Sequence, residues 1–135
     1  KQATEQALAA YPDIDGVWSQ GGAMTQGALE AFQAAGRDLV PMTGEDSNGF
    51  LKAWKVAQAD GFEAIAASDA CWMGKVALEM ALKALSGEPV EKYHYISVPT
   101  ITDEDIDLYV RPEYSDSYWC NTKMPKEVAD KYYLE

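Results

Sequence analysis

Three short polar loops, each directly after an apolar run, carry the residue types that could do chemistry. They are Ser19-Gln20-Gly21-Gly22, Thr43-Gly44-Glu45-Asp46 and Ser68-Asp69-Ala70-Cys71-Trp72. In open α/β sheets, ligands bind outside the carboxyl ends of the strands, where such loops meet at one edge. Each loop alone also resembles a helix cap, since Ser, Asp and Gly are the residues that caps need. Gln20, Glu45 and Trp72 are poor capping residues, so the three loops together favour a ligand site.

The same loops offer little for catalysis. The chain has no Gly-x-Gly-x-x-Gly after its first apolar run and no Gly-Lys-Ser/Thr, so nothing indicates a nucleotide phosphate site. Cys71 has no histidine near it in the pattern to activate it, and the only histidine, His94, falls in a predicted strand. Glu45 and Asp46 are neighbours in a turn, and neighbouring side chains in a turn usually point apart, so the two carboxylates are poor candidates for a general acid and a general base. We expect recognition without catalysis, no cofactor and no bound metal.

Charge and hydropathy exclude two classes of partner. The chain of 135 residues has 11 basic and 22 acidic side chains, which gives a net charge of −11. Duplex nucleic acid and anionic membrane surfaces need a basic footprint, so we expect neither as a partner. No apolar stretch reaches the roughly 18 residues that a membrane span requires, so no membrane insertion is expected.

The elements that must position the loops alternate between short apolar runs and helical patterns. Strands are expected at residues 14–18, 39–42 and 64–67, and helices at about 23–35, around 50–57 and at about 70–85. This alternation indicates βαβ units, so the predicted fold class is α/β with a doubly wound parallel sheet. The apolar runs show no polar alternation, which is typical of strands covered by helices on both faces.

The last third of the chain has a different character. The pattern predicts a strand at residues 93–98, a polar turn at 100–105 and an amphipathic helix at about 125–133. The helix at 70–85 is apolar on more than one side, and such a helix is usually buried on most sides. Three or four strands offer too little surface to bury it, so we expect that part of the molecule is missing from this chain.

The order of motifs resembles a known family. The stretches YPDIDGVWSQGGAMTQGALEAFQAAGR and LVPMTGEDSNGFLKAW resemble the later part of ribose-type (type I) periplasmic sugar-binding proteins of ABC transporters. The Met-x-x-Gly-Ala-Leu-x-Ala-Phe run and the strand ending in a Gly-x-Asp turn are typical of that family. The helix MGKVALEMALKALSGEPV and the turn ITDEDIDLY follow in the same order. The resemblance covers nearly all of the chain.

The resemblance implies two α/β lobes, joined by a three-stranded hinge, that close on a sugar. Residues 1–68 would be part of the C-terminal lobe. Residues 69–135 would hold a hinge crossing, a helix and a strand of the N-terminal lobe, and the C-terminal tail. The implied function is the solute-binding component of an ABC importer, which binds a sugar or polyol in the periplasm, hands it to a membrane permease and is not an enzyme.

The resemblance also assigns individual residues. The family's strand-end asparagine falls at Gly21, with Gln20 beside it as a substitute donor, and a second family contact falls at about Ala67 or Ser68. Asp46 matches an aspartate that accepts hydrogen bonds from adjacent sugar hydroxyls. The candidate ligand-binding residues are Gln20, Gly21, Glu45, Asp46, Ser68 and Trp72.

Two tryptophans and two cysteines leave alternatives open. Trp72 is as suited to stacking on a sugar as to packing, whereas Trp18 is expected in the core. Cys71 and Cys120 form either a disulfide that ties the tail to the third loop or two separate thiols.

Three other functions share this pattern. The effector-sensing domain of a lac-repressor-type transcription regulator has the same fold, although the acidic charge and the Tyr/Trp-rich tail weigh against it. An autoinducer-binding protein of this fold is a variant of the binding function. A small α/β enzyme is the remaining alternative.

Overall fold

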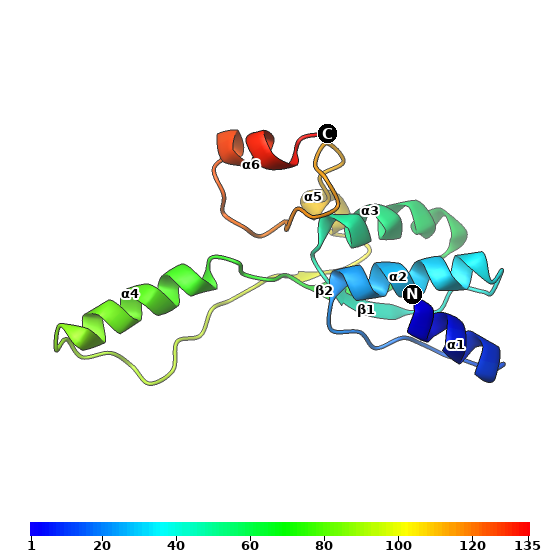
Figure 1. Cartoon of the computed structure of the whole chain (residues 1–135), viewed down its shortest axis with the longest axis horizontal. Helices are drawn as coiled ribbons and strands as arrows, with labels where there is room; N and C mark the ends of the chain where they lie inside the picture. Colours follow the sequence, from blue (N-terminus) through cyan, green and yellow to red (C-terminus); the bar gives the residue numbers. More distant parts are fainter.

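A three-stranded sheet organises the chain in a computed structural model that describes residues 1–135 (Figure 1). The strand order is β1 (Met42–Glu45), β2 (Ala64–Ala67) and β3 (Thr100–Ile101). β1 and β2 are parallel, with Met42 opposite Ala64 and Glu45 opposite Ala67. β3 is antiparallel to β2, with Ile101 opposite Ala66. The parallel pair joined through a helix confirms the predicted α/β class.

Helices make up most of the rest of the chain. They are α1 (Gln2–Ala10), α2 (Gly22–Ala34), α3 (Asn48–Ala57), α4 (Met73–Leu85), α5 (Ile106–Tyr109) and α6 (Lys126–Tyr133), with a 3-10 turn η1 (Gln58–Asp60) after α3. The helices predicted near residues 23–35, 50–57, 70–85 and 125–133 are thereby confirmed, with ends shifted by a few residues. None of the helices combines the length and apolar character needed to cross a membrane.

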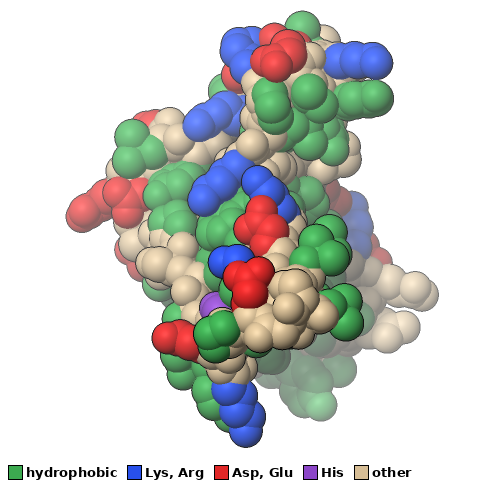
Figure 2. Space-filling view, turned by 90° about the vertical axis from the view of Figure 1, so that its left-hand side faces the viewer, with side chains coloured by type: hydrophobic (Ala, Val, Ile, Leu, Met, Phe, Trp, Pro, Cys, Tyr) green, Lys and Arg blue, Asp and Glu red, His purple; other side chains and the backbone are tan.

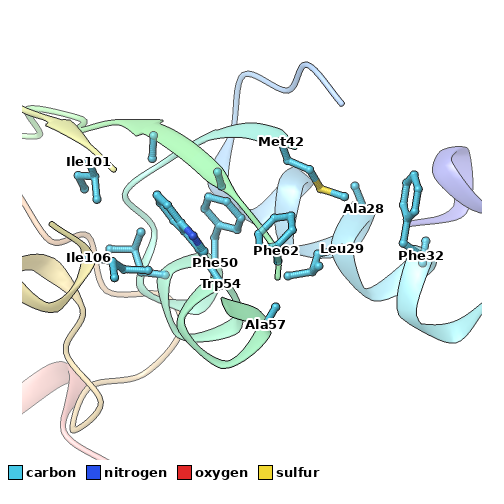
Figure 3. Close-up of a cluster of buried hydrophobic side chains, with 14 of the residues drawn as sticks. Ala28, Leu29, Phe32, Met42, Phe50, Trp54, Ala57, Phe62, Ile101 and Ile106 are labelled. Atoms are coloured by element: carbon cyan, nitrogen blue, oxygen red, sulfur yellow. The ribbon is translucent and has the colours of Figure 1, made fainter. Parts of the chain in front are cut away.

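The core lies between β1, α2 and α3. Phe50 and Trp54 of α3 are fully buried and stack with their ring centroids 5.6 Å apart. Phe32 of α2 and Met42 of β1 are also buried in this cluster, as Figure 3 shows. Phe50 and Trp54 are four residues apart and lie on one face of α3. Packing of this face against α2 and β1 holds the start of α3 at the carboxyl end of β1.

The helices α2 and α3 cover only one face of the sheet in this chain. The buried face of β1 meets these helices, since a Cβ at Gly44 would touch Phe50 and Thr25. On the other face, Ile65 is 47% exposed and Ala67 is exposed as well. The helices of this chain therefore leave one face of the sheet open, and alternate residues of β2 face solvent.

Two predicted strands differ in the structure. Residues 14–18 form only a single parallel bridge, between Val17 and Met42, in place of a full strand. Residues 93–98 form no strand, and Tyr95 there is 94% exposed because no neighbouring segment pairs with it. The strand lies at Thr100–Ile101, where a turn was expected, because burial of Ile101 against the core outweighs the polar character of its neighbours.

Helix α4 projects away from the sheet and its covering helices (Figure 1). None of its residues is buried, and Leu78, Leu82 and Leu85 are 61%, 57% and 84% exposed. In the view onto this end of the molecule, apolar side chains lie open beside acidic and basic ones (Figure 2). The sequence leads us to expect that this chain offers too little surface to bury this helix, and no other element of the chain covers its apolar sides.

The tail after α5 folds back onto the beginning of α3. The Asn48 side-chain amide donates hydrogen bonds to the carbonyl oxygens of Arg111 and Tyr114, at 2.8 and 2.9 Å. Its Oδ1 accepts from the backbone N–H of Arg111 at 2.9 Å. Buried Asn48 therefore satisfies backbone groups of the tail that would otherwise lack partners.

The cysteines do not form the disulfide that was one of the two expectations. Cys71 and Cys120 are separate thiols. Cys71 is exposed, whereas burial and, to a smaller extent, the nearby Asp46 carboxylate raise the pKa of the half-buried Cys120 thiol to about 12. Burial also raises the pKa of the Cys71 thiol, so both thiols favour the protonated form.

Candidate functional site

The first polar loop is fastened to β1 by threonine side chains. The Thr43 hydroxyl accepts a hydrogen bond from the Ser19 backbone N–H at 2.8 Å and donates to the Ser19 carbonyl oxygen at 2.9 Å. The buried Thr25 hydroxyl lies 2.8 Å from the Thr43 carbonyl oxygen and 3.0 Å from that of Gly21. These bonds hold residues 19–21 beside the carboxyl end of β1, as the sequence predicts.

A hollow of about 380 Å³ lies near this edge, over the uncovered face of the sheet on which Ile65 and Ala67 are exposed. Its lining comes from the first loop, from β1 and β2, and from the start of β3: Trp18, Ser19, Gln20, Thr43, Gly44, Glu45, Ile65, Ala66, Ala67 and Thr100. Gln20 and Glu45 therefore lie where the sequence places them. Trp18 is 84% exposed at the edge of this hollow, so the expectation that it packs in the core is wrong.

Asp46 lies beneath this edge and is fully buried. One carboxylate oxygen accepts the Asp69 backbone N–H at 2.6 Å. The other accepts the Ser68 hydroxyl and the Asn121 backbone N–H, both at 3.0 Å. Because the Asp46 side chain is fully buried, direct contact between its carboxylate and a ligand stays a prediction.

The edge is acidic. Partial burial raises the pKa of Glu45, and the negative charges of Asp69 and Asp46 raise it further. Burial also raises the pKa of Asp46, against the opposing effect of its hydrogen bonds from Asp69, Ser68 and Asn121. No group of three or more His, Cys, Asp or Glu side chains is arranged to hold a metal ion.

The paired glycines of the first loop have a packing role. Gly21 precedes α2 in extended conformation, and its carbonyl oxygen accepts the Thr25 N–H at 3.0 Å. A Cβ on the buried Gly22 would lie 2.6 Å from the Glu45 carbonyl oxygen and closer still to the Ser47 hydroxyl. Gly22 therefore lets the start of α2 approach the end of β1, and ligand contact by Gly21 stays a prediction.

The remaining two candidates lie beyond the hollow. Ser68 is 3% exposed and donates its hydroxyl to Asp46, so it braces the edge from inside. Trp72 immediately precedes α4, and the ammonium of Lys123 lies 3.4 Å from the centroid of its ring. The Trp72 indole N–H is buried without a hydrogen-bond partner.

Sequence reasoning missed the side chains that hold the site together. Thr43, Thr25 and Asn48 are ordinary residues in the sequence, and only the fold brings their polar atoms to strand ends. Asn121 and Lys123 belong to the tail, whose return to the site no local pattern predicts. A signal existed only for Thr43, which stands at the end of a predicted strand next to the glycine of a turn.

The structure is an α/β module in which three polar loops meet near the carboxyl ends of two parallel strands. A model of the periplasmic binding protein domain matches residues 1–89, and the chain belongs to this family. No curated protein matches the chain by sequence.

Solved structures of similar fold come from several bacteria. A structure from Mycobacterium smegmatis in complex with β-D-fucofuranose is 23% identical, with a TM-score of 0.65 over 79% of this chain and 35% of its own. An ABC transporter solute-binding protein from Agrobacterium vitis with bound D-fucose is 26% identical, with a TM-score of 0.62 over 78% and 36%.

A third structure, the periplasmic solute-binding protein of an ABC transporter from Actinobacillus succinogenes 130z with bound D-allose, is 24% identical. Its TM-score is 0.57 over 80% of this chain and 37% of its own. The present chain thus spans little more than a third of these proteins, and the likeness shows a periplasmic binding protein fold of type I.

Proposed function

We propose that this chain is part of a periplasmic solute-binding protein that captures a sugar or polyol and presents it to the permease of an ABC importer. The observation that supports this most strongly is the hollow at the carboxyl ends of β1 and β2, lined by an exposed tryptophan, an amide and a carboxylate. Family membership points the same way, as does the D-fucose in the related Agrobacterium vitis protein.

The proposed contacts follow from the side chains at the hollow. The Trp18 ring stacks on the apolar face of a sugar ring, since an aromatic face suits a surface of C–H groups. Gln20 donates to and accepts from hydroxyls, and the Glu45 carboxylate accepts from them with the added strength of a charged acceptor. Backbone groups at Gly21 add to these contacts, while Asp46 and Ser68 hold the edge in position. Trp72 borders the site next to α4.

The proposed organisation has two lobes. Residues 1–68 belong to the C-terminal lobe, and residues 69–135 contain a hinge crossing, a helix and strand of the N-terminal lobe, and the tail. The exposed apolar side chains of α4 support this, because a helix with leucines on its surface needs a partner. Closure of two lobes on the sugar is then the signal that the permease reads.

Isothermal titration of the full protein with D-fucose, D-allose and other neutral monosaccharides tests the proposal. We expect saturable binding of at least one sugar, and we expect Trp18→Ala to weaken it about tenfold or more because a stacking surface is lost. Tyr11→Ala is the matched control, since Tyr11 is also an exposed aromatic residue but lies outside the hollow. A folded protein that binds none of these sugars, or equal loss of affinity in both variants, contradicts the proposal.

A further inference from the structure

The chain leaves the sheet after β2 and reaches α4 through residues 68–72. The tail segment of residues 120–123 contacts the chain at both ends of this connection, at Asp46 on the sheet side and at Trp72 next to α4. We propose that this segment is a strut that fixes the direction of α4 relative to the sheet. Residues 69–72, which the strut spans, are the hinge crossing of the proposed two-lobed protein. A role of the strut in sugar capture therefore rests on the proposed function. The direction of α4 itself can be measured without any sugar.

The first anchor of the strut is on the sheet side, at the beginning of α3. Trp119 forms an antiparallel bridge with Ser47, and the Asn48 N–H donates to the Tyr118 carbonyl oxygen at 2.8 Å. The Asn121 N–H donates to the buried Asp46 carboxylate at 3.0 Å. Residues 118–121 therefore lie along residues 46–48 as a short added strand, and this end of the strut is rigidly attached.

The second anchor is on the α4 side. The Lys123 ammonium lies 3.4 Å from the ring centroid of Trp72, the residue directly before α4, close enough for a cation–π interaction. Lys123 is also the one non-glycine residue with a positive φ, of 52°. That conformation costs energy for a residue with a side chain, so the surrounding contacts must hold it. We infer that the contact with Trp72 is one of the contacts that hold it.

The crossing itself is fastened at its base by the same carboxylate. Asp46 accepts hydrogen bonds from the Ser68 hydroxyl and the Asp69 N–H, the first residues after β2, and from Asn121 of the tail. Asp46 thus joins the end of β1, the start of the crossing and the strut. Beyond Asp69, the Lys123–Trp72 contact ties the crossing to the tail.

The strut matters because α4 is otherwise held only by its two chain connections to the sheet, residues 68–72 before it and residues 86–99 after it. None of its residues is buried, so packing does not set its direction. Rotation of α4 about the crossing has to bend residues 69–72, and Lys123 restrains Trp72 within that stretch. The strut therefore biases the angle between α4 and the sheet, which in a two-lobed protein is the angle that opens and closes the cleft.

Distance measurements between two spin labels test the strut. One label replaces Lys83 on α4 and the other replaces Val56 on α3, both at exposed positions. The labels are attached to non-natural ketone side chains, because the exposed Cys71 would react with thiol labels. The distance distribution is recorded by double electron–electron resonance in the full protein without sugar.

We expect Lys123→Ala to raise the population of other α4 orientations by about twofold to fivefold, the range for loss of an exposed cation–π contact. Lys123→Arg should restore the narrow distribution. Lys131→Ala is the matched control, because Lys131 lies over the ring of Tyr132 at 5.1 Å on α6, outside the segments that connect α4 to the sheet. An unchanged distribution in Lys123→Ala, or equal broadening in Lys131→Ala, overturns the strut. If no sugar binds but Lys123→Ala alone broadens the distribution, the strut stands and the proposed function fails.

Discussion

At the scale of single residues, Asp46 lies where the sequence predicts, directly after β1. Its hydrogen bonds, however, give its carboxylate a structural role that the sequence does not predict. Its position after β1 follows from the Gly-x-Asp turn. Its full burial and its three donors, however, come from Ser68, Asp69 and Asn121, which lie far away in the sequence. Its first function is therefore to hold three segments at one point, whether or not a ligand also reaches it.

Replacement of Asp46 tests this role through stability. Asp46→Ala leaves the part-buried Asp69 and Asn121 N–H groups without this acceptor, at a cost of up to about 1–3 kcal/mol for each group. We expect urea unfolding to show a loss of about 2–4 kcal/mol. Asp46→Asn keeps one acceptor oxygen and should lie between the wild type and the alanine variant.

The control for this measurement is Asp60→Ala, at an exposed position on η1 where little change is expected. Equal stability of Asp46→Ala and the wild type would mean that the energetic cost of burying the charge cancels the three hydrogen bonds. In that case the Asp46 carboxylate would not stabilise the contact between the three segments.

The candidate site could be predicted at the residue scale only where a residue stands next to a strand end. Gln20 and Glu45 meet this condition and line the hollow. Trp18 was expected in the core because an apolar run precedes the loop, but at the edge of a sheet covered on one face an aromatic side chain can face solvent. Lys123 has no local signal, since its contact with Trp72 depends on the path of the tail.

At the scale of elements, the close approach of α2 to β1 sets the shape of the ligand edge. The approach is possible because Gly22 has no side chain where the Glu45 carbonyl oxygen and the Ser47 hydroxyl lie. The glycine pair in the sequence indicates a special backbone position, but whether it serves a ligand or a helix contact depends on what faces it. Here the facing group of Gly22 is the neighbouring strand end.

Gly22→Ala tests this packing. The new methyl group would have to push α2 away from β1, since the Glu45 carbonyl oxygen at 2.6 Å belongs to the backbone and cannot rotate away, and overpacking of this kind costs about 1–3 kcal/mol. Gly74→Ala is the control with the opposite sign. Gly74 lies inside α4, and a Cβ added there would have no atom within 4 Å. The higher helix propensity of alanine should therefore stabilise the protein by about 0.5–1 kcal/mol. Thermal unfolding of both variants measures the difference, and an unaffected Gly22→Ala protein would refute the packing role.

Elements with strong local patterns were predictable and those that depend on pairing were not. Helix α2 and strand β2 follow from apolar spacing and a short apolar run, and both are confirmed within a few residues. The segments 14–18 and 93–98 resemble strands in sequence, but a strand needs a neighbouring strand to pair with. Within this chain residues 14–18 form a single bridge and residues 93–98 form no pairing. Strand formation is a non-local event, which a local pattern cannot decide.

At the scale of the whole molecule, the chain has a packed side and two open surfaces. Helices α2 and α3 with one sheet face form the core, whereas the face with Ile65 and the whole of α4 are exposed. The sequence correctly predicts α4 as a helix with apolar residues on several sides. What covers those residues is not decided by this chain, which spans little more than a third of the similar solved proteins.

Hydrogen exchange of the full protein with and without bound sugar tests whether the carboxyl edge of β1 and β2 is the ligand site. We expect sugar to slow exchange in residues 18–22, 43–47 and 67–72, which surround the hollow and the side chains that support it. The opposite edge of the sheet, at residues 58–63, should exchange at the same rate in both samples. Protection of residues 58–63 with no change at the hollow, while the sugar binds, would show that the ligand site lies elsewhere.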